Sequence, residues 1–110
     1  MNHFWTKLCL ILVVLGGSAT PSLGETITLA YDSNLRPDPC SNQSLGRIAK
    51  GTNLKMQKKA FLYSGAIRTQ WFEVVYSGKK GWISDQNTTK PTKPNVDTSR
   101  IGKPCRWEEQ

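Results

Sequence analysis

The segment WFEVVYSGKKGWIS, residues 71 to 84, constrains the fold more than any other part of the chain. Two apolar-rich runs flank Ser77 and Gly78, a pair suited to the two-residue turn of a β-hairpin. That turn fixes the register, because Tyr76 then lies opposite Lys79 and the pairs continue outward to Trp71 opposite Ser84. The segment therefore predicts two paired antiparallel strands.

Strand pairing also sorts the hairpin side chains into two faces, because directly opposed residues share a face. The face that we expect to enter the core holds Phe72, Val74, Tyr76, Gly81 and Ile83. The opposite face holds Trp71, Glu73, Val75 and Trp82. The two indoles on this second face are diagonal neighbours, close enough for large rings to touch.

Two explanations of this tryptophan pair remain open. In the first, Trp71 and Trp82 form an exposed aromatic platform beside Lys79, Lys80 and the loop 32–40, suited to a peptide or a glycan. In the second, the C-terminal tail covers both rings with its few apolar side chains, which are Ile101, Pro104 and Trp107.

The rest of the chain shows no sustained helical stripe of apolar residues, which favours further strands. Ile27, Leu29 and Tyr31 alternate with threonine and alanine, the period of a half-buried strand. Residues 32–44 are rich in Pro, Asp, Asn and Ser and predict a long irregular loop. Turn signals follow at Lys50-Gly51 and at residues 64–66. The short strands on either side of the first turn hold Ile48, Leu54 and Met56.

Residues 1–24 have the three-part pattern of a secretory signal peptide, in which Lys7 precedes an apolar run and small residues follow it. We place cleavage between Gly24 and Glu25, with a cut after Ala19 as the alternative. An N-terminal membrane anchor is the competing interpretation, but the run is shorter than the roughly 18 residues of a spanning segment. We therefore expect a secreted or periplasmic protein with no membrane span after signal removal.

Cleavage would remove Cys9 and leave Cys40 and Cys105 as an even pair. In an oxidising compartment such a pair predicts a disulfide. Closing a loop of some 64 residues would contribute on the order of 4 kcal/mol in the chain-entropy model. Cys105 lies in residues 88–110, which are rich in proline and threonine and poor in apolar residues, so we expect an irregular tail tethered by the disulfide.

The mature chain is basic. Of 15 basic residues only Lys7 is lost, all 8 acidic residues stay, and the net charge is about +6. This balance favours anionic partners such as wall polymers, acidic membrane surfaces or nucleic acid, although scattered basic residues also simply solvate a small domain. Export argues against nucleic acid as the partner.

Several short motifs follow one another in an order that is typical of a known family. Residues 33–56, SNLRPDPCSNQSLGRIAKGTNLKM, followed by WFEVVYSGKKGWIS, resemble the bacterial SH3-like (SH3b) domain. The matching positions are Leu35-Arg36, Pro39, Ile48, Lys50-Gly51, Trp71, Val74, Gly78, Gly81-Trp82 and Ile83. The family commonly has Ser-Gly-Pro after the arginine, whereas this chain has the sequence RPDPC.

The resemblance implies a small, partly open SH3-like barrel of five or six antiparallel strands over residues 25–87, with residues 88–110 outside the family pattern. It also implies a module without catalysis, directed to cell-wall peptidoglycan or to peptides. We expect such a module to present Trp71 and Trp82, with Arg36, Lys79 and Lys80 around them, to a wall peptide, a glycan or a protein. The alternative is a disulfide-stapled secreted effector or inhibitor that acts on another protein through its C-terminal tail.

Catalytic chemistry is not evident in the mature sequence. The one histidine of the full chain, His3, would leave with the signal peptide, and the mature sequence has no Cys/His metal spacing or Gly-rich phosphate loop. Asp32 and Asp38 could pair for glycoside hydrolysis, but aspartates of this kind more commonly bond to the backbone of turns. We expect a monomeric non-enzyme without cofactor or metal. Asn42 and Asn87 begin N-glycosylation sequons, which have meaning only in a source that glycosylates secreted proteins.

Overall fold

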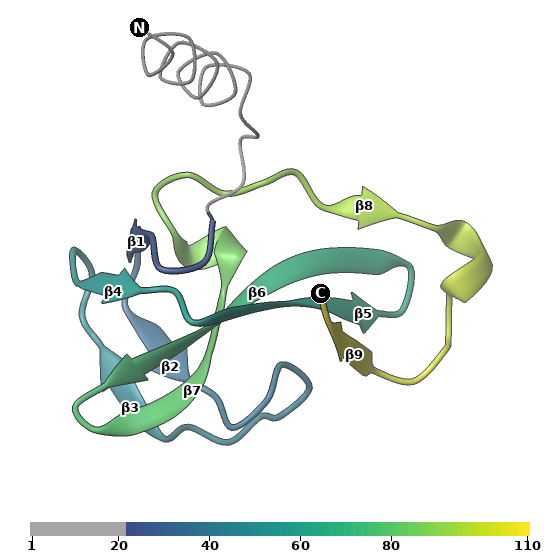
Figure 1. Cartoon of the computed structure of the whole chain (residues 1–110). Coiled ribbons are helices and arrows are strands. Elements are labelled where there is room, and N and C mark those ends of the chain that lie inside the picture. The colour runs from purple at the N-terminus through teal and green to yellow at the C-terminus, as the bar shows by residue number, and fades with distance from the viewer. Residues whose placement is uncertain (1–21) are drawn as a thin grey trace, which may run out of the picture.

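The structure is a computed structural model that describes residues 22–110, so the predicted signal peptide lies almost wholly outside the described residues. This part of the chain folds into strands with two short 3-10 helices (Figure 1). In chain order the elements are β1 (Thr26–Thr28), β2 (Ser33–Leu35), β3 (Gly46–Ile48), β4 (Asn53–Lys55), β5 (Lys58–Ser64), β6 (Ile67–Tyr76), β7 (Lys79–Ser84), η1 (Asp85–Asn87), β8 (Asn95–Val96), η2 (Thr98–Arg100) and β9 (Arg106–Glu109).

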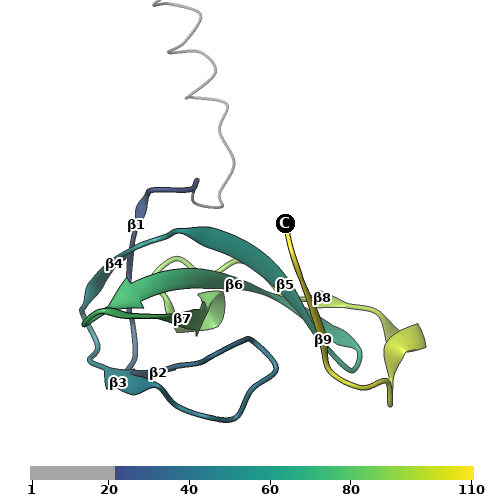
Figure 2. The same ribbon diagram turned by 60° about the horizontal axis from the view of Figure 1, so that its bottom comes forward.

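Every strand pairing is antiparallel, and the strands form three open sheets. The largest runs β7-β6-β5-β9, with β8 beside the first residues of β6, while β1 pairs with β4 and β2 pairs with β3. Figure 2 shows the two small sheets gathered at one end of the large sheet and the tail at the other end. The all-β prediction is confirmed, and within residues 22–110 the sheets remain open and do not close into a barrel.

The core lies where the two small sheets face the large one. It combines the alternate residues of short strands that each contribute one or two apolar side chains. The buried members are Ile27, Leu29, Leu35, Ile48, Leu54, Met56, Phe72, Val74 and Ile83, with Leu45 and Tyr76 packed against them. The core face predicted for the 71–84 hairpin is therefore correct.

The β6–β7 hairpin has the predicted register. Tyr76 pairs with Lys79 and the pairing continues to Trp71 opposite Ser84. Ser77 and Gly78 adopt φ values of 52° and 76°, and positive φ at both turn residues gives the strands the twist that a two-residue hairpin requires.

Three predictions about the chain outside this hairpin need correction. Tyr31 does not continue the first strand but is 63% exposed, because β1 ends at Thr28 and the chain bends after Leu29. The loop predicted over residues 32–44 contains β2, which pairs with β3. The tail is also more regular than predicted, because it contributes β8 and β9; the five or six strands expected over residues 25–87 correspond to the seven strands β1 to β7.

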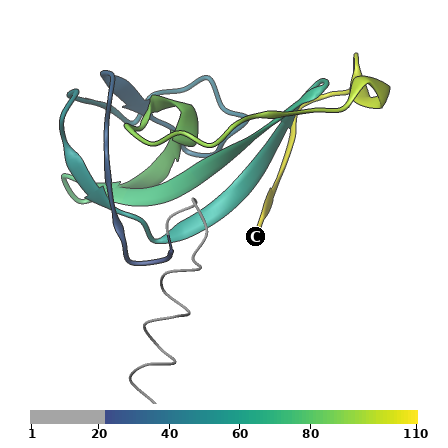
Figure 3. The same ribbon diagram turned by 90° about the horizontal axis from the view of Figure 1, so that it is seen from above.

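The tail holds the end of the β5–β6 hairpin from both edges. β8 pairs with β6 through Ile67 and Arg68, and β9 pairs with β5 from Ala60 to Tyr63. Since β5 and β6 are neighbours, the two tail strands lie at opposite edges of the hairpin. Figures 1 and 3 show the chain running past the hairpin end between these two contacts.

Candidate functional site

Trp82 points away from the main core, as strand pairing predicts, but its ring is not exposed. Its exposed fraction is 4%, and its ring centroid lies 5.3 Å from that of Trp107 with the planes tilted by 58°. The pairing of β9 with β5 places Trp107 opposite Leu62, on the face that also carries Trp82. The structure therefore agrees with the second explanation for Trp82, in which the tail covers its ring.

The other predicted lid residues do not take part in this cover. Ile101 is 70% exposed, and Pro104 is exposed as well. Trp71 is half-buried on β6, and its indole nitrogen donates to the hydroxyl of Thr69 at 3.1 Å. The aromatic contact that forms is between Trp82 and Trp107, so the two predicted platform rings do not present one continuous aromatic surface.

Two of the predicted basic ligand residues are occupied by backbone carbonyls. The Arg36 guanidinium donates to the carbonyl oxygens of Asn42 and Gln43 at 2.7 and 3.2 Å, which closes the loop after β2. The Lys79 ammonium donates to the carbonyl oxygen of Leu45 at 2.9 Å. Lys80 is exposed on β7 opposite Val75. Arg36 and Lys79 thus position the loop between β2 and β3, whereas Lys80 faces solvent.

The predicted disulfide joins Cys40 and Cys105, whose Cα atoms are 6.0 Å apart. It ties the loop after β2 to the residue directly before β9. Residues 106–109 then pair with β5, and the amide of Gln110 donates to the carbonyl oxygen of Lys59 at 3.0 Å. The covalent bond and the strand pairing therefore hold the C-terminal end of the tail at one place on the sheet.

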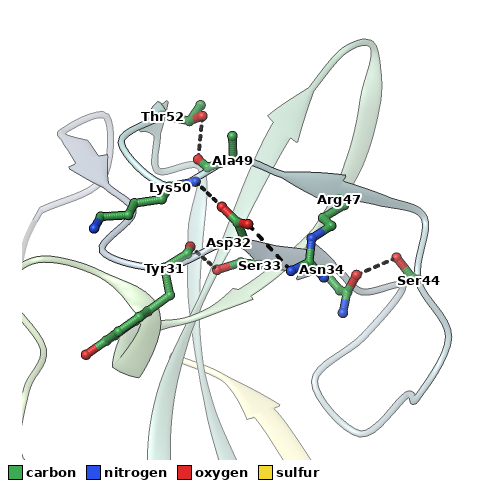
Figure 4. Close-up of polar contacts among 9 residues, drawn as sticks. All are labelled: Tyr31, Asp32, Ser33, Asn34, Ser44, Arg47, Ala49, Lys50 and Thr52. Carbon is green, nitrogen blue, oxygen red and sulfur yellow. Dashed lines mark hydrogen bonds and ion pairs between the residues drawn. The ribbon is translucent and has the colours of Figure 1, made fainter.

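Asp32 and Asp38 are both engaged by backbone amides rather than by each other. The Asp38 carboxylate accepts from the amide of Cys40 at 2.8 Å, the geometry of an Asx turn. Asp32 accepts from the amide of Lys50 at 2.8 Å, and its second oxygen lies 3.6 Å from the Arg47 guanidinium (Figure 4). The Lys50 amide, helped by the charge of Arg47, holds the pKa of Asp32 below its ordinary value.

A pocket of about 260 Å³ lies where the tail crosses the end of the β5–β6 hairpin. Tyr63 and residues 65–68 line it from the hairpin, and residues 95–97 and Arg100 line it from the tail. The amide of Asp97 donates to the carbonyl oxygen of Ala66 at 2.7 Å, which fixes the tail against the hairpin turn. Neither segment forms this pocket alone.

Arginine side chains stack on aromatic rings around this pocket. The guanidinium carbon of Arg68 lies 4.4 Å from the ring centroid of Phe61, and that of Arg100 lies 4.8 Å from the ring centroid of Tyr63. Arg106 on β9 also stacks on Tyr63, at 4.4 Å. Stacking of this kind engages the face of the guanidinium and leaves its N–H groups available at the edge.

Sequence reasoning missed the residues of this pocket. The turn signal at residues 64–66 could have indicated part of the pocket, because a two-residue turn at Gly65-Ala66 places Tyr63 opposite Arg68. Arg100 had no comparable signal. It comes from η2, whose position depends on the tail contacts rather than on any periodic pattern.

The part of the chain that the structure describes contains no helix with the length and apolar character needed to cross a membrane. Residues 22–110 also contain no group of three or more His, Cys, Asp or Glu side chains placed to hold a metal ion. Comparison with protein-family models, with curated proteins and with solved structures gives no match.

Proposed function

We propose that the chain is a non-catalytic binding module that works outside the cytosol and recognises the peptide part of a cell-wall polymer. Its binding surface is the end of the β5–β6 hairpin together with the tail that crosses it. The observation that carries the proposal is the pocket between these two segments. The β6–β8 pairing and the hydrogen bond from the Asp97 amide to the Ala66 carbonyl oxygen hold its tail wall against the hairpin, and the disulfide and the β5–β9 pairing anchor the end of the tail beyond it. A disulfide of this kind is compatible with an oxidising compartment.

The surface proposed here differs from the one expected from the sequence. Trp82 is covered, and Arg36 and Lys79 bind carbonyl oxygens of the loop between β2 and β3. Those side chains would have to leave their present partners to contact a ligand. The pocket at the hairpin end requires no such rearrangement, because its arginines are already held by stacking.

A non-catalytic role is supported by how the acidic residues near the loops are used. Asp38 and Asp97 each accept a hydrogen bond from the backbone amide two residues on, as turn aspartates do, and Asp32 accepts from the amide of Lys50 on a neighbouring turn. A carboxylate pair for acid–base chemistry would need both groups directed at one reacting bond.

The test is co-sedimentation of the disulfide-bonded protein with purified peptidoglycan. We expect saturable retention in the pellet and no release of soluble wall fragments. A Cys40→Ser, Cys105→Ser double variant should show weaker retention, because the disulfide no longer anchors the C-terminal end of the tail, and Arg47→Gln should bind as the parent does. Wild-type protein that stays in the supernatant at every concentration contradicts the wall target. Release of soluble fragments contradicts the non-catalytic role.

A second candidate function is an effector or inhibitor that binds another protein through the tail. The observation that favours it is the exposure of apolar side chains on the tail, with Val96 at 69% and Ile101 at 70%. Exposed apolar residues grouped on one surface are typical of protein contact sites. Absence of wall binding together with saturable binding of a short peptide would favour this candidate.

A further inference from the structure

We infer that the pocket at the end of the β5–β6 hairpin binds a peptide carboxylate, with Arg68 and Arg100 as the side chains that bind it. This inference rests on the proposed function only in taking the chain to be a binding module, and it names the chemical group that the module recognises.

Arg100 carries a polar atom that has no partner. Its Nε is buried, and within residues 22–110 it makes no hydrogen bond. A buried donor left unsatisfied destabilises the protein, so an acceptor that enters the pocket and reaches this group gains binding free energy. The guanidinium is held over the ring of Tyr63, which limits the entropy lost when a ligand binds.

Arg68 is the second cation on the pocket wall. Its guanidinium stacks on Phe61, and in the described part of the chain it forms no ion pair. Arg106 provides an internal comparison, because it stacks on Tyr63 but also lies 3.8 Å from the carboxylate of Glu108. The arginine with an ion pair lies outside the pocket lining, and Arg68 and Arg100, which form none within residues 22–110, are part of the lining.

Asp97 is the acidic residue of the pocket lining, and its charge determines the net charge of the pocket. Its carboxylate accepts from the hydroxyl of Ser99 at 2.7 Å and from the amide of Ser99 at 3.1 Å. These two hydrogen bonds, with a smaller contribution from the charge of Arg100, hold the pKa of Asp97 below its ordinary value, so it is negatively charged at neutral pH. Two arginines against one aspartate leave one net positive charge, which suits a singly charged carboxylate better than a doubly charged phosphate.

The size and rim of the pocket indicate a small group on a larger molecule. A volume of about 260 Å³ is below the range of roughly 300 to 1,000 Å³ that encloses a whole drug-sized ligand. Ile67 and Val96 line it and are 48% and 69% exposed, so apolar surface lies next to the arginines. A carboxylate beside a small aliphatic side chain fits this combination, and the planar guanidinium matches a carboxylate with two parallel hydrogen bonds.

The test follows the side-chain N–H signals of the arginines by NMR during titration of the disulfide-bonded protein. The probes are N-acetyl-alanyl-alanine, its C-terminal amide, and N-acetyl-aspartyl-alanine amide, which carries its carboxylate on a side chain. We expect saturable shifts of the Arg100 and Arg68 Nε–H signals with an acid probe and none with the uncharged amide. Arg47, on β3 at the other end of the molecule, is the internal reference and should not shift. Saturation with either acid supports the inference. The acid that saturates at the lower concentration shows whether a C-terminal or a side-chain carboxylate is preferred.

Matched variants separate binding from folding. Arg68→Gln and Arg100→Gln should each move the saturation point about tenfold or more to higher concentration, because a charge-assisted hydrogen bond is lost. Arg68→Lys keeps the charge but not the planar fork, and it should fall between Arg68→Gln and the parent. Arg47→Gln removes the same charge elsewhere and should leave the titration unchanged. The backbone spectrum of each variant shows whether the sheet is intact.

Four outcomes would overturn the inference: no shift with either acid, equal shifts with acid and amide, parallel shifts of Arg47, or saturation by inorganic phosphate at lower concentration than by the acids. These results are distinguishable from failure of the proposed wall target. If the protein does not pellet with peptidoglycan but the acid titration saturates at Arg68 and Arg100, the pocket assignment is supported and the wall polymer is excluded as its source of carboxylate.

Discussion

Gly81 lies where β7 meets the segment after β2, and the packing there depends on the absence of a side chain. A Cβ atom at this position would come within 2.6 Å of the Leu35 side chain and 2.8 Å of the Arg36 carbonyl oxygen. Trp82 and Arg36 exchange backbone hydrogen bonds of 2.8 and 3.0 Å at the same point. The close approach lets residues of β2 cover one end of the last hairpin.

Gly81→Ala should lower the free energy of unfolding by about 1 to 3 kcal/mol, because the added methyl group meets backbone as well as side chain. Gly46→Ala is the matched control, since nothing lies within 4 Å of its added carbon and its φ is not positive. Urea unfolding of the two variants and the parent measures the effect. Equal stability of the two variants would contradict the close approach of β2 and β7.

Asp32 contributes a stability term with a predictable pH dependence. Its folded pKa is lowered by the amide of Lys50 and by Arg47 from the ordinary value of 3.8 that applies to the unfolded chain. The ionised group therefore stabilises the fold above that pH, and the stabilisation is lost as the pH falls through the lowered folded pKa.

Asp32→Asn keeps an acceptor for the Lys50 amide but removes the charge. We expect its stability to fall less steeply than that of the parent below about pH 4, measured by urea unfolding at a series of pH values. Asp97→Asn should also make the loss of stability at low pH less steep, and this effect should add to that of Asp32→Asn. The reason is that the pKa of Asp97 is lowered by Ser99, in a different part of the chain. A parent and an Asp32→Asn variant with the same slope would show that the Lys50 contact does not form.

At the scale of elements, β9 is the part of the tail that protects the second face of the large sheet. Ala60, Leu62 and Trp82 are buried there although they are not part of the main core cluster. Trp107 comes from β9 and contacts the ring of Trp82. This four-residue edge strand therefore adds one aromatic side chain to the cover of this face.

Trp107→Ala should expose Trp82 while the β6–β7 hairpin stays paired, because the hairpin is held by its own turn and by the main core. Hydroxyl-radical footprinting with peptide mass spectrometry resolves the oxidation rate of each tryptophan. We expect the rate of Trp82 to rise several-fold and that of Trp71 to change little. An unchanged rate at Trp82 would mean that something other than β9 covers it.

The sequence predicted the elements that are contiguous and missed those that depend on distant contacts. The β6–β7 register follows from one turn and two apolar-rich runs, and the Cys40–Cys105 bond follows from an even pair. The sequence RWEE of β9 has a single apolar residue, so no alternation marks it as a strand. Its pairing with β5 depends on where the disulfide places it. Arg100 and the pocket could not be predicted for a similar reason, because their positions also depend on contacts between the tail and the distant hairpin.

For the whole molecule, the tail joins regions that are far apart in the sequence. The disulfide closes a separation of 65 residues, and β8 and β9 bind the two edges of one hairpin. Constraining a loop of this length stabilises the folded chain by roughly 4 kcal/mol in the chain-entropy model. The proposed carboxylate pocket exists only because both the hairpin and the tail are held in this arrangement.

Hydrogen exchange of the backbone amides in β9 tests this arrangement most directly, with the Ser77-Gly78 turn as the fast reference. In the disulfide-bonded protein we predict strong protection of the β9 amides that bond to β5 and of Gln110, which donates to Lys59. Reduction of the Cys40–Cys105 bond should remove most of that protection while β6 and β7 stay protected. Exchange of the β9 amides at the rate of an unstructured peptide, with the disulfide intact, would contradict the account.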